Sequence, residues 1–321
     1  MKKKILIATE IDNIDGLREK LSNYYQITYF PNIRPEDINQ IDSEISAIFT
    51  NPNNSKIYYG KETLQRFGNI EFLVTASTGT IHIDKDYLKE NEIDLISISK
   101  SYSILNQITS TAEQAFMLTM AGLRNYSQSI KSVDKGFWDY SEFTGRQMNC
   151  LKIGVLGFGR LGKMYAHFAK SFGSSVKCCD PFKQDEITQN GYINCDIEEL
   201  FSSSDVISIH IHADKENLKI INSELLSLAS SKLILVNTSR GEVVDERALI
   251  DFLKKNKESK YLSDVIKDEH LGIGNNILYK SDLYGTQIFI TPHCGGMTTD
   301  ARAIAYHHAA DLLLKESKTI T

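Results

Sequence analysis

An arginine, an acidic residue and a histidine each lie just past a short apolar run in the second half of the chain. They are Arg240, Glu269 and His293. If these runs are parallel strands, their carboxyl ends meet at one edge of a sheet, and the three side chains gather there. An arginine can bind a carboxylate through two parallel N–H groups, and a histidine can give a proton to a carbonyl oxygen. The set therefore predicts reduction of a 2-oxo acid, with the acidic residue orienting and charging the histidine.

A glycine-rich turn in the middle of the sequence predicts a dinucleotide site. The segment 157–162 reads Gly-Phe-Gly-Arg-Leu-Gly, directly follows the apolar run 152–156 and precedes a helical pattern at 163–172. The next apolar run, 175–179, leads into Asp180, close to the usual distance of about 20 residues past the last glycine. The motif thus stands in the strand–turn–helix order that dinucleotide binding requires.

Each position of this turn has a physical role. Gly157 allows the tight turn, Gly159 lets the backbone approach a pyrophosphate, and Gly162 lets the helix pack against the strand. The N-terminus of the helix offers free N–H groups and a partial positive charge to the phosphates. Arg160 and Leu161 lie in the same loop and are assigned to the cofactor site, where Arg160 contacts a pyrophosphate or solvent.

The carboxylate of Asp180 indicates which dinucleotide is bound. It can accept hydrogen bonds from the hydroxyls of the adenosine ribose, and it would repel a 2′-phosphate. The predicted cofactor is therefore NAD rather than NADP.

Short apolar runs alternate with helical patterns along almost the whole chain. The runs are 5–8, 45–49, 72–74, 93–98, 152–156, 175–180, 205–210, 233–237, 261–265 and 287–291. Strands that alternate with helices predict βαβ units and parallel sheets. The fold class is therefore α/β, with two Rossmann-like or flavodoxin-like domains joined near residue 100. The second series begins with a helix whose capping box is Ser110 and Glu113, and a last helix spans about 298–314.

Length and charge exclude several classes of protein. The chain has 321 residues, enough for two domains. Lys and Arg number 36 against 41 Asp and Glu, and this net charge of -5 argues against a nucleic-acid partner. No apolar run reaches the roughly 20 residues of a membrane helix. Residues 2–4 are all Lys, but the run 5–8 is too short for the apolar core of a signal peptide and is interpreted as a first strand.

The cysteines and histidines predict neither disulfides nor a metal site. The five cysteines are odd in number and form no Cys-x-x-Cys pair, which indicates reduced thiols and a cytoplasmic location. His210 and His212 are spaced two apart on a predicted strand, without an obvious third ligand. Cys294, beside His293, is interpreted as a thiol that lines the site, since no thioester chemistry is implied.

Four motifs, in their order along the chain, resemble the D-isomer-specific 2-hydroxyacid dehydrogenases, the family that includes D-3-phosphoglycerate dehydrogenase. The motifs are the glycine turn, Asn-Thr-Ser-Arg-Gly at 237–241 with Val-Asp at 244–245, Asp-Val at 264–265 with Glu269, and Thr-Pro-His at 291–293. The resemblance covers the chain from about residue 72 onward. It implies an NAD-dependent oxidoreductase that transfers a hydride between nicotinamide and C2 of a small D-2-hydroxy acid or 2-oxo acid.

The resemblance also implies a split architecture. Residues 1–100 and 297–321 would form the substrate domain, and the NAD-binding Rossmann domain, 101–296, would be inserted between them. Two such chains would form a homodimer through the nucleotide domain.

Site residues are assigned by the same resemblance. Arg240 matches the substrate-binding arginine, His293 the acid/base and Glu269 its acidic partner, with Asp268, one position away, left as an alternative. Besides the glycine turn and Asp180, the residues assigned to the cofactor are His210, Thr238, Asp264 (near the nicotinamide amide), Gly295 and Gly296. The residues assigned to the substrate carboxylate, besides Arg240, are Ser77, Thr78 and Gly79, whose loop offers backbone N–H groups.

Three departures from the family pattern leave parts of the site open. His270 stands where the family often has Pro, His210-x-His212 replaces His-x-Pro, and the segment 99–109 lacks the usual Pro. The substrate stays open among D-3-phosphoglycerate, glyoxylate or hydroxypyruvate, D-lactate and sugar-derived acids. The alternative function is an NAD(H)-sensing module that keeps the fold and regulates partners.

Overall fold

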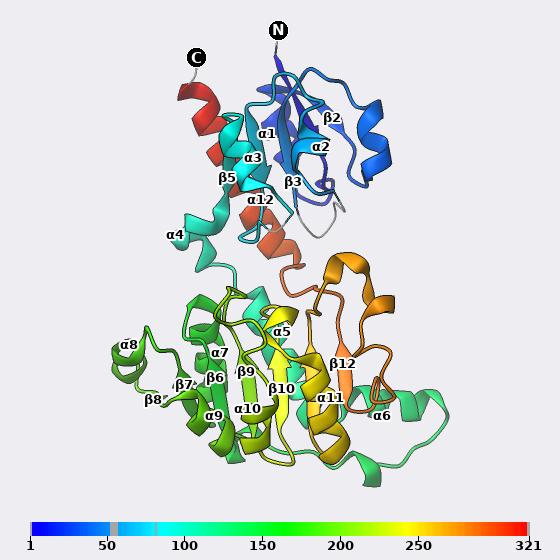
Figure 1. Cartoon of the computed structure of the whole chain (residues 1–321), viewed down its shortest axis with the longest axis vertical. Helices are drawn as coiled ribbons and strands as arrows, with labels where there is room; N and C mark the ends of the chain where they lie inside the picture. The colour runs from blue at the N-terminus through cyan, green and yellow to red at the C-terminus, as the bar shows by residue number, and fades with distance from the viewer. Residues whose placement is uncertain (1, 52–56, 81, 320–321) are drawn as a thin grey trace. The chain divides into compact units, whose positions relative to one another are not determined.

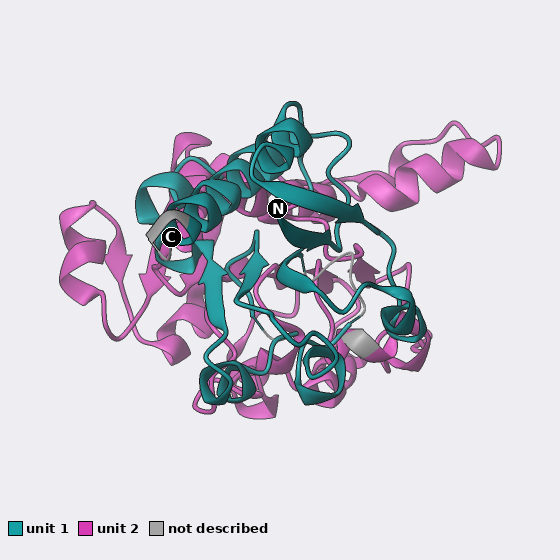
Figure 2. Cartoon of the chain, turned by 90° about the horizontal axis from the view of Figure 1, so that it is seen from above, with its two compact units in different colours: residues 1–108, 297–321 teal, residues 109–296 magenta. Residues whose placement is uncertain are grey.

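The chain is organised as two compact units. The computed structural model describes residues 2–51, 57–80 and 82–319. Unit 1 holds residues 1–108 and 297–321, and unit 2 holds residues 109–296 (Figure 2). The first boundary lies past helix α4 (Tyr102–Leu105), a few residues beyond the sequence-based boundary at residue 100.

Unit 1 is built on a five-stranded parallel sheet with the strand order β2-β1-β3-β4-β5. The strands are β1 (Lys3–Ile7), β2 (Tyr25–Tyr29), β3 (Ile45–Thr50), β4 (Phe72–Thr75) and β5 (Asp94–Ser97). Its α-helices are α1 (Leu17–Ser22), α2 (Lys61–Leu64), α3 (Lys85–Glu90), α4 and α12 (Thr299–Thr319), with short 3-10 helices at Pro35–Gln40 and Ile98–Lys100. The last helix of the chain thus belongs to the unit of the N-terminal strands (Figure 1).

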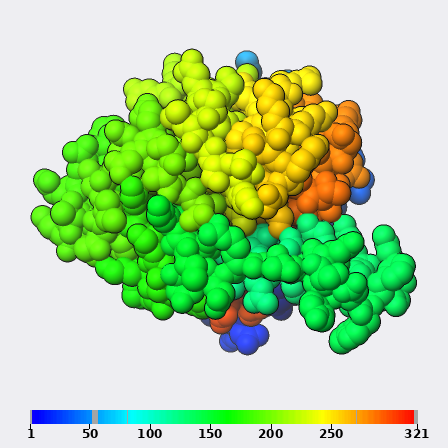
Figure 3. All heavy atoms as spheres, turned by 90° about the horizontal axis from the view of Figure 1, so that it is seen from below, coloured from blue at the N-terminus to red at the C-terminus, as the bar shows by residue number. Residues whose placement is uncertain are grey.

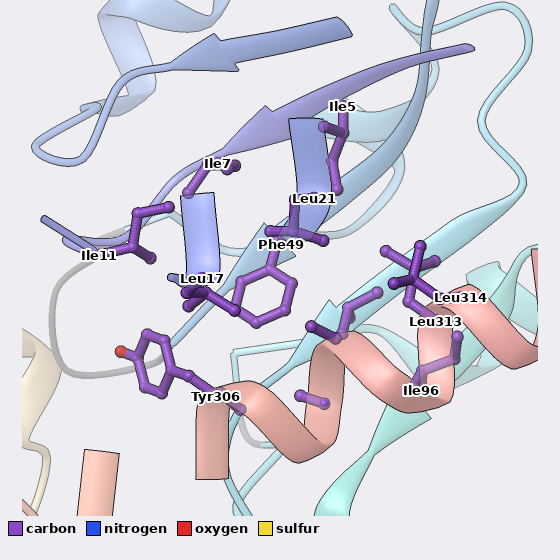
Figure 4. Packing of buried hydrophobic residues seen from close by; sticks show 14 of the residues in the cluster. Ile5, Ile7, Ile11, Leu17, Leu21, Phe49, Ile96, Tyr306, Leu313 and Leu314 are labelled. Carbon is purple, nitrogen blue, oxygen red and sulfur yellow. The ribbon is translucent and has the colours of Figure 1, made fainter. Parts of the chain in front are cut away.

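Alternate residues of β1 enter two cores, one on each face of this sheet. Ile5 and Ile7 belong to a cluster that includes Phe49 of β3 and Tyr306 of α12 (Figure 4). Leu6, between them, belongs to the other cluster. Successive side chains of a strand point to opposite faces, so a continuous apolar run is typical of a strand that is covered on both sides.

A buried histidine makes the stability of unit 1 depend on pH. His82 is 8% exposed, and neither of its ring nitrogens has a hydrogen-bond partner in the described part of the chain. Burial lowers the pKa of His82 to about 4, whereas an unfolded histidine has a pKa of about 6.5. Between these values the unfolded chain binds a proton that the folded chain does not. The folded state therefore loses stability as the pH falls from about 6.5 to about 4.

We expect the substitution His82→Leu to weaken this pH dependence. Within that window, the free energy of unfolding of the wild type should fall relative to that of the variant by up to about 1.4 kcal/mol for each unit by which the pH is lowered. Urea unfolding at pH 7, 6 and 5 measures the difference, and His167→Leu, at an exposed histidine, is the control. A difference between His82→Leu and wild type that stays constant from pH 7 to pH 5 would contradict this prediction.

Unit 2 is built on a seven-stranded parallel sheet with the strand order β12-β11-β10-β9-β6-β7-β8. The strands are β6 (Lys152–Leu156), β7 (Ser175–Cys179), β8 (Ile193–Asn194), β9 (Val206–Ile209), β10 (Ile234–Asn237), β11 (Lys260–Ser263) and β12 (Ile288–Ile290). The strand order reverses at β6, because the chain runs outward through β7 and β8 and then returns to place β9 on the other side of β6. Ligands of open parallel sheets bind at such a switch point, outside the carboxyl ends of the strands.

Helices cover both faces of this sheet. The α-helices are α5 (Ser110–Leu123), α6 (Tyr126–Asp134), α7 (Arg160–Ser171), α8 (Gln184–Gln189), α9 (Ile197–Ser203), α10 (Ser223–Leu228) and α11 (Glu246–Lys255). Short 3-10 helices lie at Ser141–Phe143, Met148–Cys150, Gly241–Val243, Glu269–Leu271 and Ile273–Asn275. One core cluster contains residues of α5 and α7, and the other contains residues of α9, α10 and α11. Over the ranges that the structure describes, no helix is long and apolar enough to span a bilayer.

Candidate functional site

The turn after β6 is shaped by three glycines. Gly157 has φ +92°, and a Cβ there would lie 2.7 Å from the carbonyl oxygen of His210. A Cβ on Gly162, in the first turn of α7, would lie 2.0 Å from the carbonyl oxygen of Gly157, so that only glycine allows this close packing of helix and strand. A Cβ on Gly159 would meet no atom of the described residues within 4 Å. The turn is therefore closed toward the sheet and open at Gly159, which leaves room for a ligand to approach the backbone.

Asp180 follows β7 and is hydrogen-bonded to the glycine turn. Its Oδ2 accepts from the backbone N–H of Phe158 at 2.9 Å, and its Oδ1 accepts from the N–H of Phe182 at 3.0 Å. An ionised carboxylate has about four acceptor positions, so each oxygen can accept a further hydrogen bond. This geometry fixes the carboxylate beside the turn and leaves it able to bind hydroxyl groups.

His210, just past β9, is a neutral histidine. Its Nε2 lies 2.9 Å from the hydroxyl of Ser208, and its ring packs against the ring of Tyr165 at a centroid distance of 5.2 Å. Its Nδ1 is buried without a hydrogen-bond partner among the described residues, and burial lowers the pKa of His210 to about 3. His210 therefore contributes a neutral aromatic surface, not a positive charge, to the switch point.

The loop after β10 is held by Asn237. Its side-chain oxygen accepts from the backbone N–H of Ser239 at 3.0 Å, and its Nδ2 donates to the carbonyl oxygen of Arg240 at 2.9 Å. A Cβ on Gly241 would lie 2.0 Å from the carbonyl carbon of Ile266, so this loop packs directly on the backbone of the loop after β11. Among the described residues, the half-buried Arg240 donates a single hydrogen bond, to the carbonyl oxygen of Ser239 at 2.6 Å. A guanidinium has five N–H donors, so most of its capacity remains for an anion.

The imidazole of His293 is paired with Glu269. Its Nδ1 lies 2.7 Å from Oε2 of Glu269, whose Oε1 accepts from the backbone N–H of Ile266 at 3.3 Å. The alternative acid, Asp268, lies beside Lys267, with 3.4 Å between Oδ2 and Nζ. None of the described residues hydrogen-bonds to Nε2 of His293. The pair thus leaves one ring nitrogen free for a reacting group.

The turn that carries His293 is anchored on a buried carboxylate. His293 has φ +52°, a conformation that costs a residue other than glycine about 1–3 kcal/mol. Asp264 is 1% exposed and accepts the backbone N–H groups of Cys294 at 3.0 Å and Gly295 at 2.7 Å, and also the hydroxyl of Thr291. These hydrogen bonds hold the chain on both sides of His293 and thereby maintain its unusual backbone conformation.

The other site residues predicted from the sequence differ in their burial and in their hydrogen bonds. Thr238 is buried, and its hydroxyl has no partner among the described residues. Leu161 is half-buried in α7, while Gly296 is exposed. Ser77, Thr78 and Gly79 follow β4 in unit 1, where the hydroxyl of Ser77 bonds to that of Thr75 at 2.9 Å and to the carbonyl oxygen of Gly79 at 2.7 Å.

The thiol of Cys294 lies beside the carboxylate of Asp264. Burial raises the pKa of this thiol, and its Sγ lies 3.5 Å from Oδ1 of Asp264. A thiol with a raised pKa is a poor nucleophile, which agrees with its interpretation as a residue that lines the site. No group of three His, Cys, Asp or Glu side chains suited to a metal ion occurs within the described ranges.

One residue at this site escaped the sequence analysis. Gln114 of α5 donates from Nε2 to Thr291 at 3.1 Å and lies 3.5 Å from Asp264. A glutamine in a helix with an apolar face carries no signal of its own. Only its place in a helix that packs against β10 and β11 brings it to this loop.

A parallel sheet with a glycine turn at its switch point defines unit 2 as a dinucleotide-binding α/β unit. Residues 116–295 match the NAD binding domain of the D-isomer specific 2-hydroxyacid dehydrogenases, and the chain belongs to this family.

Individual relatives extend the similarity to nearly the whole chain. The D-3-phosphoglycerate dehydrogenase of Archaeoglobus fulgidus is 30% identical over 302 residues, which cover 93% of this chain and 54% of the relative. The glyoxylate reductase of Thermococcus litoralis is 28% identical, with 94% of this chain and 90% of the relative covered. The structure of D-lactate dehydrogenase from Aquifex aeolicus, complexed with NAD and lactic acid, has a TM-score of 0.79 and 25% identity, and covers 98% of this chain and 95% of that one. The chain spans about half the length of the phosphoglycerate dehydrogenases that it matches.

Proposed function

We propose that the chain is an NAD-dependent oxidoreductase that transfers a hydride between nicotinamide and C2 of a small D-2-hydroxy acid or 2-oxo acid. The observation that carries this proposal is the His293–Glu269 pair. It lies past β12 and β11, and Arg240 lies past the adjacent strand β10. The relatives are named as dehydrogenases and reductases, which supports an enzyme over an NAD(H)-sensing module.

The residues around the glycine turn fit an NAD molecule. The open space at Gly159 suits a pyrophosphate. The buried hydroxyl of Thr238 has no hydrogen-bond partner among the described residues, and a ligand could supply one. We propose that the turn 157–162 binds the pyrophosphate and that Asp180 binds the adenosine ribose. When bound, NAD accepts or supplies the hydride at C4 of its nicotinamide.

Two side chains would act on the substrate, and a third would hold one of them in place. Arg240 binds the carboxylate of the 2-oxo acid through two N–H groups, which fixes the orientation of the carbonyl. His293 gives a proton from Nε2 to the carbonyl oxygen during reduction and takes it back during oxidation. Glu269 holds Nδ1, so that Nε2 faces outward, and stabilises the protonated ring.

A panel of 2-oxo acids tests this function. The protein is mixed with NADH and, in turn, glyoxylate, hydroxypyruvate, pyruvate or 3-phosphohydroxypyruvate, and the absorbance at 340 nm is followed. We expect oxidation of NADH with at least one of these acids. NADH binding without turnover on the whole panel would favour the sensing module and contradict the proposed activity.

Asp180 should make the enzyme prefer NADH over NADPH. A 2′-phosphate at this position would meet a carboxylate that is already fixed by two backbone N–H groups. We expect a preference of about 100-fold or more, equivalent to about 2.7 kcal/mol, which Asp180→Ser reduces to about tenfold or less. Ratios of kcat/KM for the two cofactors measure this, with Asp185→Ser, at an exposed carboxylate of α8, as control. Equal use of NADPH by the wild type would refute the assignment.

We further propose that the chain forms a homodimer through the segment 126–140 of unit 2. No residue of α6 is buried. The exposed apolar side chains of this segment are Tyr126, Ile130, Val133, Phe137, Trp138 (93% exposed) and Tyr140. Figure 3 shows this part of unit 2, in green, standing out from the surface. Exposed apolar surface of this extent marks an interaction site.

Light scattering tests the dimer. The double variant Phe137→Ser, Trp138→Ser should shift the protein from dimer to monomer, whereas Tyr102→Ser, at an exposed aromatic residue of unit 1, should not. A monomeric wild type would contradict the proposal.

We also propose a reducing, cytoplasmic location, which the five free thiols support.

A further inference from the structure

We infer that Gln114 is a positioning residue for His293, acting through the hydroxyl of Thr291 and the carboxylate of Asp264. This inference rests on the proposed function, in which His293 is the acid/base. Gln114 lies in the second turn of α5, and within the described ranges no hydrogen bond joins it to His293. Its contacts are with the residues that hold the His293 turn in place.

The orientation of the Gln114 amide follows from its surroundings. Its Nε2 lies 3.1 Å from Oγ1 of Thr291 and 3.5 Å from Oδ1 of Asp264. The carboxylate of Asp264 already accepts two backbone N–H groups, so it presents an acceptor to the amide. The NH₂ end of Gln114 must therefore face this cluster, since its oxygen would be repelled by the carboxylate.

This orientation decides where the Thr291 hydroxyl donates. Thr291 has two acceptors within reach, the carboxylate of Asp264 and the carbonyl oxygen of Ser263 at 3.4 Å. The amide of Gln114 donates into the lone pairs of Oγ1 and thereby keeps the hydroxyl directed at Asp264. The backbone N–H of His293 in turn donates to the carbonyl oxygen of Thr291 at 2.9 Å. Gln114 therefore fixes the residue from which the His293 turn starts.

Close packing also connects helix α5 to the residues that follow His293. A Cβ on Gly295 would lie 3.4 Å from the side chain of Thr111, 3.5 Å from Cβ of Gln114 and 3.0 Å from Asp264. The first two turns of α5 thus lie directly against the chain after His293. Because His293 holds an unfavourable positive φ, its backbone keeps this conformation only while the neighbouring residues restrain it. Gln114 restrains both ends of this turn.

The substitution Gln114→Met keeps the length of the side chain and removes the donor. We expect kcat for the best 2-oxo acid to fall about tenfold, since a displaced acid/base group costs rate, while KM and the affinity for NADH change less than about twofold. Thr291→Val should have a similar effect. The kcat of the double variant should be little lower than that of either single variant, because both substitutions remove the same hydrogen bond between Gln114 and Thr291. Gln189→Met, at an exposed glutamine of α8, is the control.

A second measurement does not depend on turnover. The ring signal of His293 in ¹H–¹³C spectra, assigned with the His293→Gln variant, should shift in Gln114→Met and stay unchanged in Gln189→Met. An unchanged signal together with unchanged kcat would overturn the inference. So would a loss of kcat matched by an equal loss of NADH affinity and thermal stability, since that is the mark of a merely structural role. If the wild type reduces no 2-oxo acid, the proposed function fails, and the ring signal alone decides on Gln114.

Discussion

The His293→Gln variant is expected to lose most of its turnover, with kcat for reduction of the 2-oxo acid lowered about 10²–10⁴-fold, the usual effect of removing a general acid. Glutamine can fill the space of the ring and accept or donate hydrogen bonds, but it cannot release a proton to a carbonyl oxygen. The dissociation constant for NADH should change less than twofold, because His293 itself is assigned to the substrate and not to the cofactor. Steady-state kinetics and fluorescence titration with NADH measure the two quantities.

A matched pair of variants shows which acid supports His293. Glu269 lies 2.7 Å from Nδ1, whereas Asp268 faces Lys267. We expect Glu269→Gln to lower kcat for reduction, because a neutral amide holds the Nδ1 side of the ring less firmly than the charge-assisted hydrogen bond of a carboxylate. Asp268→Asn should leave kcat unchanged. The reverse pattern would transfer the role to Asp268, and full activity of His293→Gln would remove histidine from the mechanism.

The second large effect is expected at Arg240. Lysine keeps the positive charge, but it offers a single ammonium in place of the two parallel N–H groups of a guanidinium. We expect Arg240→Lys to raise KM for the 2-oxo acid by about 10-fold or more and to lower kcat by up to about 10²-fold, because a misoriented carbonyl no longer faces its proton donor. NADH affinity should barely change.

The control for this variant is the same substitution on the next helix. Arg247 is exposed on α11, so Arg247→Lys should leave both kinetic constants unchanged. If Arg240→Lys abolishes NADH binding and leaves the kinetics for the 2-oxo acid intact, Arg240 belongs to the cofactor site. That result would contradict the proposed role of Arg240 in binding the carboxylate.

The sequence alone could predict those features that depend on contacts between residues a few positions apart in the chain. The turn 157–162 has a recognisable form because Gly157 and Gly162 meet each other across a few residues. Asn237 likewise holds Arg240 from three residues away. Parallel strands buried on both faces leave continuous apolar runs, so most of the two sheets could also be predicted. These local devices account for the agreement on the α/β fold.

The features that could not be predicted depend on contacts between residues that lie far apart in the sequence. Gln114 meets residues 150, 177 and 180 positions away, which no spacing in the sequence reveals. The pattern of the final helix did not by itself assign it to either domain; the family resemblance placed it in the substrate domain, and in the structure it packs on β4 and β5 of unit 1. The capping box expected at Ser110 and Glu113 does not form. The N-cap is Thr109, whose hydroxyl bonds to the Glu113 carboxylate and to no backbone N–H of the helix, and the Ser110 hydroxyl is buried without a partner among the described residues.

Transfer of deuterium tests the central claim, hydride transfer to C2, most directly. The protein is incubated with NADH that carries deuterium at both C4 positions and with the 2-oxo acid that it reduces fastest. The product is then examined by NMR and by chiral chromatography. The proposed function predicts a 2-hydroxy acid with one deuterium at C2 and the D configuration. A product without deuterium at C2, an L product, or binding of NADH without any product would contradict it.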